Sequence, residues 1–436
     1  MADNPKSTGV PRRFGTHSMN DVIVIGGGPA GSTAATLLAR RGLSVLLLER
    51  DRFPRFQIGE SLLPYNNDLF DRLGLSEKLQ AGDFFPKYGA EFVTGDGTIG
   101  YTFRFDQNLA EQYHRSFQVK RSEFDHLLLR NAAQSGVEVR EETSVTAVQL
   151  DDPNRAVIET STGERLEARF VIDASGHGAL IGNRIGGKSN VESLKKVAFF
   201  AHYRNVPRPP GRDAGNTLIV VLRDAWFWMI PITEELMSVG LVVDREHVKS
   251  CGMSPEELLA RTIAETPYVA NRMNAAERVT QVYARKDFSY AMERMVGRNF
   301  ALIGDAAGFI DPIFSTGVFI AMKSADLAAA AVEQRLRSGS MRFLRNYERS
   351  VKGALHKYFR FISNFYRREF LEVFMQPRPK FGLVPVIVGV LAGNVFAERG
   401  DRLKLDLFFA LVAVQKHLGL IAPRIEWERL PAAASV

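Results

Sequence analysis

A glycine-rich turn between two apolar segments constrains this chain more than any other feature. Residues 21–25 form a short β-branched run, typical of a buried parallel strand, and lead directly into the turn. Residues 32–40 predict a helix, and a second apolar strand over residues 43–48 ends on Glu49. The turn contains Gly26, Gly28, Pro29, Ala30 and Gly31. Strand, turn, helix, strand and acid in this order predict a dinucleotide-binding unit.

Each part of this unit has a physical role. Gly26 permits the tight turn, Gly28 lets the backbone approach a pyrophosphate, and Gly31 lets the helix pack closely on the strand. The helix N-terminus offers unpaired N–H groups to the phosphates. Glu49 lies 18 residues after Gly31, where its carboxylate accepts the ribose hydroxyls, and Arg50 completes this part of the predicted cofactor site.

The turn itself does not choose between NAD and FAD, but a second segment favours FAD. At residues 300–320 a short strand ends in Gly304 and Asp305, and a Pro- and Gly-containing loop then leads into a helix at Thr316, Gly317 and Val318. Asp305 is placed to bind a sugar or ribityl hydroxyl, and the N–H groups of the helix start suit the flavin pyrimidine or an anion. The alternative is an ordinary strand, loop and helix with a capping Asp.

Together, these motifs and three further segments resemble the flavoprotein monooxygenases with a p-hydroxybenzoate-hydroxylase-like fold. The additional segments are Gly59-Glu60-Ser61, Arg121 with Phe124-Asp125, and Asp173-Ala-Ser-Gly176. The resemblance implies an α/β fold, with a Rossmann-like FAD-binding domain, a mostly antiparallel substrate domain and a helical C-terminal segment. It also places Ser61, Arg121, Val145 and Asp173 in the cofactor site.

The expected domain organisation is discontinuous. The FAD-binding domain is predicted to be interrupted by the substrate domain and followed by a helical region, after a disordered N-terminal tail. The predicted ranges are 1–19 for the tail; 20–80, 115–185 and 295–335 for the FAD-binding domain; 81–114 and 186–294 for the substrate domain; and 336–436 for the helical region.

A sharper resemblance is to the flavin-dependent halogenases of the compact phenol and pyrrole type. Residues 226–231 match the Trp-x-Trp-x-Ile-Pro signature of that family, and on a strand alternate side chains form an aromatic wall on one face. The predicted substrate-tunnel residues are Trp226, Trp228, Ile230 and Pro231. Read from the strand alone, the same side chains favour ordinary sheet core, because alternating aromatic residues are common in buried strands.

The resemblance also implies a catalytic lysine. Lys87, between Phe84-Phe85 and Phe92, matches the lysine region of the halogenases, and its apolar neighbours favour a partly desolvated amine. The alternative is a solvated lysine at a strand edge. By the same resemblance, Thr316 and Gly317 hold the halide, and no metal takes part.

The implied reaction uses reduced FAD, O2 and chloride or bromide to form hypohalous acid, which then halogenates an electron-rich aromatic ring through Lys87. Because no second nucleotide fingerprint is evident, a separate flavin reductase is implied as partner. The aromatic substrate is either free or tethered to a carrier protein.

Three other functions remain open from the sequence. An FAD-dependent aromatic hydroxylase would use the same fold without a halide, and a geranylgeranyl-reductase-like oxidoreductase would need no Lys87. A non-catalytic flavin-binding protein is the third alternative.

Composition limits which other classes of function and location fit this chain. A net charge of +7 without a basic block argues against nucleic-acid binding. One cysteine, Cys251, excludes a disulfide within the chain and favours a reducing compartment, and the polar N-terminus does not predict a signal peptide. Residues 381–397 are apolar but interrupted by glycines and a proline, which predicts a buried helix with a turn and no membrane span. We therefore expect a cytoplasmic protein.

Overall fold

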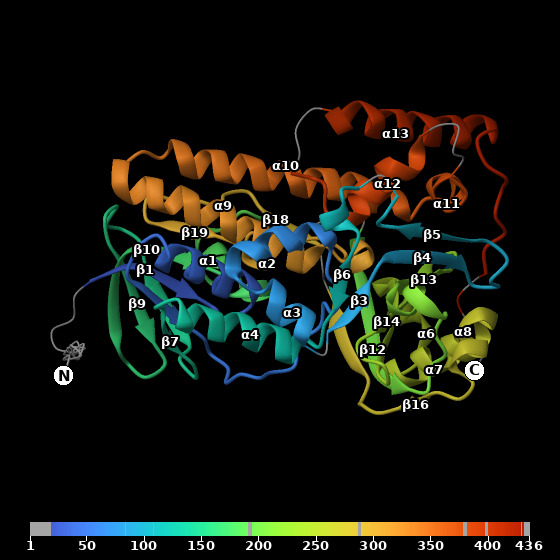
Figure 1. Ribbon diagram of the computed structural model, residues 1–436, viewed down its shortest axis with the longest axis horizontal. Coiled ribbons are helices and arrows are strands. Elements are labelled where there is room, and N and C mark those ends of the chain that lie inside the picture. Colours follow the sequence, from blue (N-terminus) through green and yellow to red (C-terminus); the bar gives the residue numbers. More distant parts are fainter. Residues whose placement is uncertain are drawn as a thin grey trace, which may run out of the picture.

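The computed structural model describes residues 19–82, 84–107, 109–190, 194–286, 289–377, 382–396, 400–428 and 430. The predicted N-terminal tail lies outside these residues, except for Met19. Two large sheets lie side by side, and long helices from the C-terminal part cover both (Figure 1).

The first sheet is the predicted dinucleotide-binding sheet. Within the described residues it has seven strands in the order β7-β2-β1-β10-β9-β8, with β19 beside β10. The strands β7, β2, β1, β10 and β19 run parallel, whereas β9 and β8 are antiparallel additions. The bounds are β1 (Asn20–Ile25), β2 (Val45–Leu48), β7 (Glu138–Arg140), β8 (Val145–Gln149), β9 (Ala156–Thr160), β10 (Arg165–Asp173) and β19 (Phe300–Leu302).

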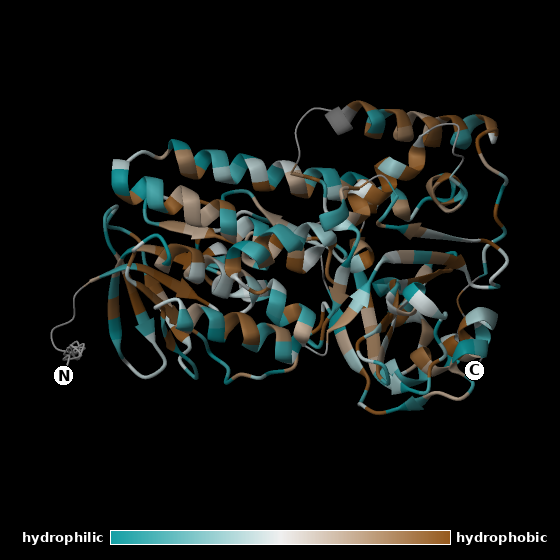
Figure 2. Ribbon diagram, in the orientation of Figure 1, coloured by the Kyte–Doolittle hydropathy of each residue, from teal (hydrophilic) through white to brown (hydrophobic). Residues whose placement is uncertain are grey.

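Helices cover both faces of this sheet, so its central strands are buried on both sides. Figure 2 shows β1 and β10 coloured as hydrophobic, and Val22, Ile23 and Val24 are fully buried. Apolar residues throughout a strand are the pattern of a parallel strand that is covered on both faces. The covering helices are α1 (Pro29–Ala39), α4 (Arg121–Gln134), α9 (Thr316–Ser338) and α10 (Arg342–Phe365), with the short α2 (Asn67–Leu73), α3 (Ser76–Ala81) and α5 (Leu180–Ile185) at the ends.

The second sheet is almost entirely antiparallel, as the resemblance implies. Within the described part its order is β16-β12-β15-β14-β13-β4-β5, with β17 beside β12, and only β13 and β4 pair in parallel. Its bounds are β4 (Gly89–Thr94), β5 (Gly100–Arg104), β12 (Lys196–Arg204), β13 (Thr217–Val221), β14 (Ala225–Pro231), β15 (Met237–Asp244), β16 (Glu277–Arg278) and β17 (Tyr283–Lys286). The helices α6 (Arg245–Cys251), α7 (Pro255–Glu265) and α8 (Pro267–Met273) lie between β15 and β16 in the chain.

Two small sheets lie between the large ones. The strands β3 (Phe85–Lys87) and β6 (Ser116–Gln118) form an antiparallel pair at the junction, and β11 (Lys188–Asn190), β18 (Tyr290–Met292) and β20 (Gly308–Phe309) form a three-stranded sheet. Lys87 therefore lies on the junction pair and not in the large substrate sheet.

The C-terminal region is helical, with α11 (Arg368–Met375), α12 (Leu383–Ala392) and α13 (Gly400–Leu418) above the β4 and β5 end of the second sheet (Figure 1). The predicted buried helix with a turn is confirmed: α12 is largely buried and ends at Gly393 with φ 109°. Phe381 and Ala397, the ends of that prediction, lie outside the described residues. No helix among the described residues combines the length and hydrophobicity that crossing a membrane requires.

Substitutions at two glycines test how closely α1 packs against β1 in the dinucleotide-binding unit. A Cβ atom on Gly31 would lie 1.8 Å from the carbonyl oxygen of Gly26, so Gly31→Ala forces α1 away from β1. We expect a loss of about 1–3 kcal/mol in the free energy of unfolding, measured by chemical denaturation, together with weakened FAD binding. Gly353, exposed in α10 with no atom near its missing Cβ, is the matched control: Gly353→Ala should stabilise by about 0.5–1 kcal/mol. Equal effects of the two changes would contradict the packing argument.

Candidate active site

The glycine turn closes against the end of β10. Gly26 has φ 103°, and a Cβ atom there would lie 2.4 Å from the carbonyl oxygen of Ala174. Helix α1 begins at Pro29, three residues before the predicted start, because proline is pre-organised for the first helical position and Gly28 takes the N-cap. The N-cap has no side-chain hydrogen bond, so the first N–H groups of α1 remain available to an anion.

The acidic and basic residues after β2 surround this turn. Glu49 is buried and accepts hydrogen bonds from the backbone N–H of Gly27 (2.6 Å) and of Asp51 (2.9 Å). Arg50 is largely exposed and pairs with Asp51. The sequence reasoning missed Arg55, whose guanidinium lies 3.5 Å from the Cβ position of Gly28 and places a cation beside the turn.

Arg121 begins helix α4 and joins several segments. Its guanidinium makes a bidentate ion pair with Asp125, with distances of 2.7 and 2.9 Å, and also donates to the carbonyl oxygens of Ile58 and Gly59. The Cβ position of Gly59 is 2.8 Å from Arg121 and 3.8 Å from the Val318 side chain. The structure therefore brings Arg121 to the start of α9, as a shared cofactor site requires.

Asp173 also lies at the candidate site, where its carboxylate accepts hydrogen bonds from its own loop. It accepts from the N–H and hydroxyl of Ser175 and from the N–H of Ile181, at 2.6–3.0 Å, and it is fully buried. Burial raises the pKa of Asp173. These contacts make Asp173 a cap that shapes the loop after β10, and its role as a direct cofactor ligand stays a prediction.

The remaining predicted cofactor residues include the loop after β19 and the start of β8. A Cβ atom on Gly304 would lie 2.9 Å from that of Ala30, so the loop after β19 touches α1. Burial raises the pKa of the neighbouring Asp305, whose carboxylate lies 3.6 Å from His177. Val145 begins β8, two residues beyond Thr143, whose N–H donates to the Glu49 carbonyl oxygen at 2.8 Å.

The start of α9 contains an unsatisfied hydroxyl. Ser315 has φ 55° and leads into Thr316, whose Oγ1 is buried and has no hydrogen-bond partner among the residues that the structure describes. Gly317 follows, with the Phe309 ring 3.2 Å from its Cβ position. The N-terminus of α9, a helix of 23 residues, and the buried Thr316 hydroxyl together provide hydrogen-bond donors for a small anion.

The loop before α9 is tied to the aromatic wall through the C-terminal region. The Trp226 indole N–H donates to the Tyr366 hydroxyl at 3.0 Å, and Tyr366 donates to Asp311 at 2.7 Å. Burial raises the pKa of both Tyr366 and Asp311. The sequence reasoning missed Tyr366 and Asp311, because nothing in the motif indicates that the end of α10 returns to it.

The tryptophan strand has the predicted alternation. Trp226, Trp228 and Ile230 pack in the core that faces the first sheet and the C-terminal helices, whereas Phe227 and Met229 pack in the core on the opposite face. The Trp228 indole N–H donates to the Ser238 hydroxyl at 3.0 Å, and Pro231 ends β14. The described contacts place Trp226 in the Asp311 network, whereas Lys87 belongs to a different network.

Lys87 is buried, with 2% of its surface exposed, which excludes a solvated strand-edge lysine. Its amine donates to the Ser61 hydroxyl at 2.8 Å and to the Leu62 carbonyl oxygen at 3.3 Å. Burial lowers the pKa of Lys87 to about 7. Ser61, which we predicted as a cofactor residue, therefore contacts the lysine, and Thr217 extends this contact with a hydroxyl pair of 2.9 Å to Ser61.

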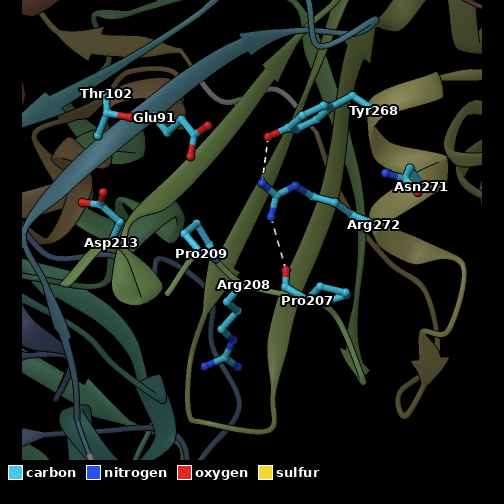
Figure 3. Close-up of a pocket in the computed structure, with 9 residues that line it drawn as sticks. All are labelled: Glu91, Thr102, Pro207, Arg208, Pro209, Asp213, Tyr268, Asn271 and Arg272. Atoms are coloured by element: carbon cyan, nitrogen blue, oxygen red, sulfur yellow. Dashed lines mark hydrogen bonds between the residues drawn. The ribbon is translucent and has the colours of Figure 1, made fainter. Parts of the chain in front are cut away.

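A groove of about 620 Å³ opens on the outer side of the second sheet (Figure 3). Arg272 crosses it and donates to the Tyr268 hydroxyl at 2.7 Å and to the Pro207 carbonyl oxygen at 3.2 Å. Glu91 lines the groove, and burial raises its pKa. None of the predicted site residues lines this groove, so we do not assign the candidate reaction to it.

Lys87 makes the stability of the protein depend on pH. Its folded pKa of about 7 lies below its ordinary value of 10.5, so between these values the unfolded chain binds one more proton than the folded one. Stability therefore rises with pH in this window. Relative to Lys87→Met, the wild type should gain about 1.4 kcal/mol per pH unit from pH 7 to 10 in chemical denaturation. Parallel pH profiles of the two proteins would contradict a neutral buried amine.

Comparison with known proteins agrees with this geometry. The family model described as tryptophan halogenase matches residues 21–114 and 103–370. A 1H-pyrrole-2-carbonyl-peptidyl-carrier-protein chlorinase of Pseudomonas fluorescens is 29% identical over 90% of this chain and 93% of its own length. The corresponding brominase of Pseudoalteromonas luteoviolacea is 34% identical over 72% of this chain and 78% of its own length. The structure of the flavin-dependent brominase Bmp2 superposes with a TM-score of 0.82 at 29% identity, over 92% of this chain and all of that one. The chain therefore belongs to the tryptophan halogenase family, with the p-hydroxybenzoate-hydroxylase-like fold of the flavin-dependent halogenases.

Proposed function

We propose that this protein is an FAD-dependent halogenase that uses a halide, O2 and reduced FAD to halogenate an electron-rich aromatic ring through Lys87. The observation that carries the proposal is the Lys87 amine. In a chain of this family it is buried, held by two acceptors, and shifted to a pKa of about 7. A substantial neutral fraction at neutral pH is what an amine needs to act as a nucleophile towards an electrophilic halogen.

The first sheet has the shape and charge to hold FAD. The close approach of Gly26 and Gly31 leaves the backbone bare at the start of α1, Arg55 adds a cation there, and Arg121 reaches the start of α9. When bound, fully reduced FAD would supply two electrons and two protons, so that O2, a halide ion and one further proton give hypohalous acid and water. The packed walls on both sides restrict water, which protects the oxidant from being lost.

The start of α9 is the proposed halide site. Thr316 Oγ1 has an unused donor, and the N–H groups of the first helical turn have no partners inside the helix. Fixed donors bind a small anion with little reorganisation, and the helix macrodipole adds positive potential at this end. Thr316 and Gly317 would orient the halide towards the flavin side of the loop.

Lys87 is the proposed catalytic residue. Its neutral amine holds or accepts the electrophilic halogen from hypohalous acid, with water as the other product, and passes it to a ring carbon that loses a proton. Trp226 and Trp228 supply an apolar wall for the route between the loop and the ring, which keeps hypohalous acid from reaching solvent. We keep the proposed domain division, with residues 81–114 and 186–294 as the substrate domain.

The relatives also bear on the substrate and partners. Both pyrrole enzymes act on a carrier-protein-bound pyrrole, as their names state, which supports a pyrrole- or phenol-type ring presented free or on a carrier protein. We propose that a separate flavin reductase supplies reduced FAD and that the protein works in the cytoplasm.

The central test supplies chemically reduced FAD, O2 and bromide with a phenolic or pyrrole acceptor, and identifies products by mass. Lys87→Met should lower halogenated product by about a hundredfold or more, because the amine is lost. FAD binding, followed by flavin fluorescence, should remain unchanged. A hydroxylated product without halogen from the wild type would support the hydroxylase alternative, and full halogenation by Lys87→Met would remove the lysine from the mechanism.

Thr316→Val tests the halide site with a side chain of nearly the same shape. The change removes an unpaired hydroxyl, so thermal stability should be unchanged or slightly higher. The KM for bromide should rise about tenfold, because an anion loses one charged hydrogen bond. Thr33→Val removes another buried, unpaired hydroxyl and should leave this KM unchanged. An unaltered bromide KM in Thr316→Val would place the halide elsewhere.

A further inference from the structure

The groove on the outer side of the second sheet is separated from the tryptophan wall by the sheet itself. Glu91 of β4 lines the groove, whereas the next residue, Phe92, packs in the core that contains Trp226 and Trp228. Neighbouring side chains on a strand point to opposite faces of the sheet. The groove volume of about 620 Å³ is that of a pocket for a small organic molecule. The groove is therefore a candidate site for a ligand other than the cofactor or the halogenated ring.

Arg272 of α8 brings a cation into the groove, and no carboxylate contacts it. Its guanidinium donates to the Pro207 carbonyl oxygen at 3.2 Å and to the Tyr268 hydroxyl at 2.7 Å, and both partners are neutral. Within the described part of the chain Arg272 has no ion pair. Arg208, which also lines the groove, points away from Arg272 (Figure 3). A guanidinium has more N–H groups than these two bonds use, so Arg272 has donors left for an anion.

Glu91 is the acidic group that faces Arg272 in the groove (Figure 3). Burial raises the pKa of Glu91, and the charge of Arg272 opposes this effect. Asp213, Arg104 and the Tyr268 hydroxyl also act on this carboxyl group, but Asp213 and Arg104 pair with each other at 2.6 Å. Glu91 forms no ion pair with any residue that the structure describes. A half-buried carboxylate without a contacting cation is unfavourable, so a bound ammonium group would stabilise it.

The two charges of the groove are near each other without touching. Arg272 is close enough to Glu91 for its charge to lower the pKa of the carboxyl group, yet no ion pair joins them. A ligand that offers an ammonium group to Glu91 and a carboxylate to Arg272 satisfies both charges. An α-amino acid carries these two groups on one carbon atom. Pro207, Pro209 and the Tyr268 ring add rigid apolar surface to the lining, which suits an apolar side chain.

We propose that this groove binds a free α-amino acid with an apolar side chain. The ammonium group of the ligand donates to the Glu91 carboxylate. The carboxylate of the ligand accepts from the Arg272 guanidinium and from the Tyr268 hydroxyl. Binding requires neither FAD nor a halide, because none of the predicted cofactor and halide residues lines the groove. The inference therefore goes beyond the proposed halogenation and does not depend on it.

Titration calorimetry of the full chain with L-leucine tests the proposal. Leucine has no aromatic ring, so the proposed halogenation does not account for its binding. Two analogues each remove one charge: N-acetyl-L-leucine lacks the ammonium group, and L-leucinamide lacks the carboxylate. Each analogue should bind about tenfold more weakly than L-leucine, or worse, as expected for a lost hydrogen bond between charged groups. Saturation with FAD should leave the affinity for L-leucine unchanged.

Glu91→Gln is the decisive variant, because it keeps the shape of the side chain and removes its charge. The affinity for L-leucine should fall about tenfold or more. The melting temperature should not fall, since Glu91 loses no ion pair and burial disfavours its charge. Arg272→Gln should weaken binding equally, although Arg272 also holds Pro207 and Tyr268. Arg261→Gln changes an arginine of α7 that does not line the groove, and this matched control should retain the wild-type affinity.

Three results would overturn the proposal. The first is a wild type that does not bind L-leucine. The second is an unchanged affinity, either of the wild type for both analogues or of Glu91→Gln for L-leucine, because the ligand would then lie away from the two charged groups. The third is loss of L-leucine binding on saturation with FAD, which would assign the ligand to the cofactor site.

Discussion

The segment Gly59–Ser61 is the constraint on which the relative placement of the two sheets and the lysine depends. Each of its three residues contacts a different part of the molecule: Gly59 lies against Arg121, the Glu60 carboxylate pairs with His202 of β12 at 2.9 Å, and Ser61 accepts from Lys87. Glu60 and His202 are both buried, so neither group finds a substitute partner in water if the segment shifts. One short stretch thus couples the cofactor region, the substrate sheet and the proposed catalytic amine.

The dinucleotide-binding unit could be predicted because its signals come from residues that are neighbours in the sequence. Pairings between strands that are far apart in the sequence could not be predicted. The strand, glycine turn and helix around Gly31 follow from neighbouring residues, because turn sterics and apolar runs act over a few positions. The pairing of β13 with β4 joins residues more than a hundred positions apart, and the pattern of either strand contains no signal for the other. The small pair β3 and β6 was missed for a second reason. Its strands are three residues each, too short to show an alternation.

The same distinction applies to the site. Lys87, Thr316 and the tryptophans were found because short motifs carry them, but their environments depend on distant segments. The sequence left a solvated lysine open, and the burial of Lys87 comes from β6 and from residues near Ser61. Asp173 was predicted as a ligand because the motif contains an acid, and only the fold shows that backbone N–H groups of its own loop also donate to that acid. Arg55 has no motif at all, and only the fold reveals its position beside Gly28.

The C-terminal region takes part in the electrostatics of the proposed halide site through Tyr366. A charged carboxylate in the loop before α9 would repel an anion held at Thr316. Burial acts against the charged form of Asp311 and raises its pKa, and its two hydrogen bonds come from Tyr366 and from the Ile313 N–H at 3.1 Å. The buried Lys196 ammonium lies 3.9 Å from the centre of the Tyr366 ring and pairs with the Asp244 carboxylate at 2.8 Å, so this pair adds no net charge. The raised pKa of Asp311 makes the surroundings of the helix start less negative, and Tyr366, at the end of α10, helps to hold this carboxyl group in place although it does not belong to the motif.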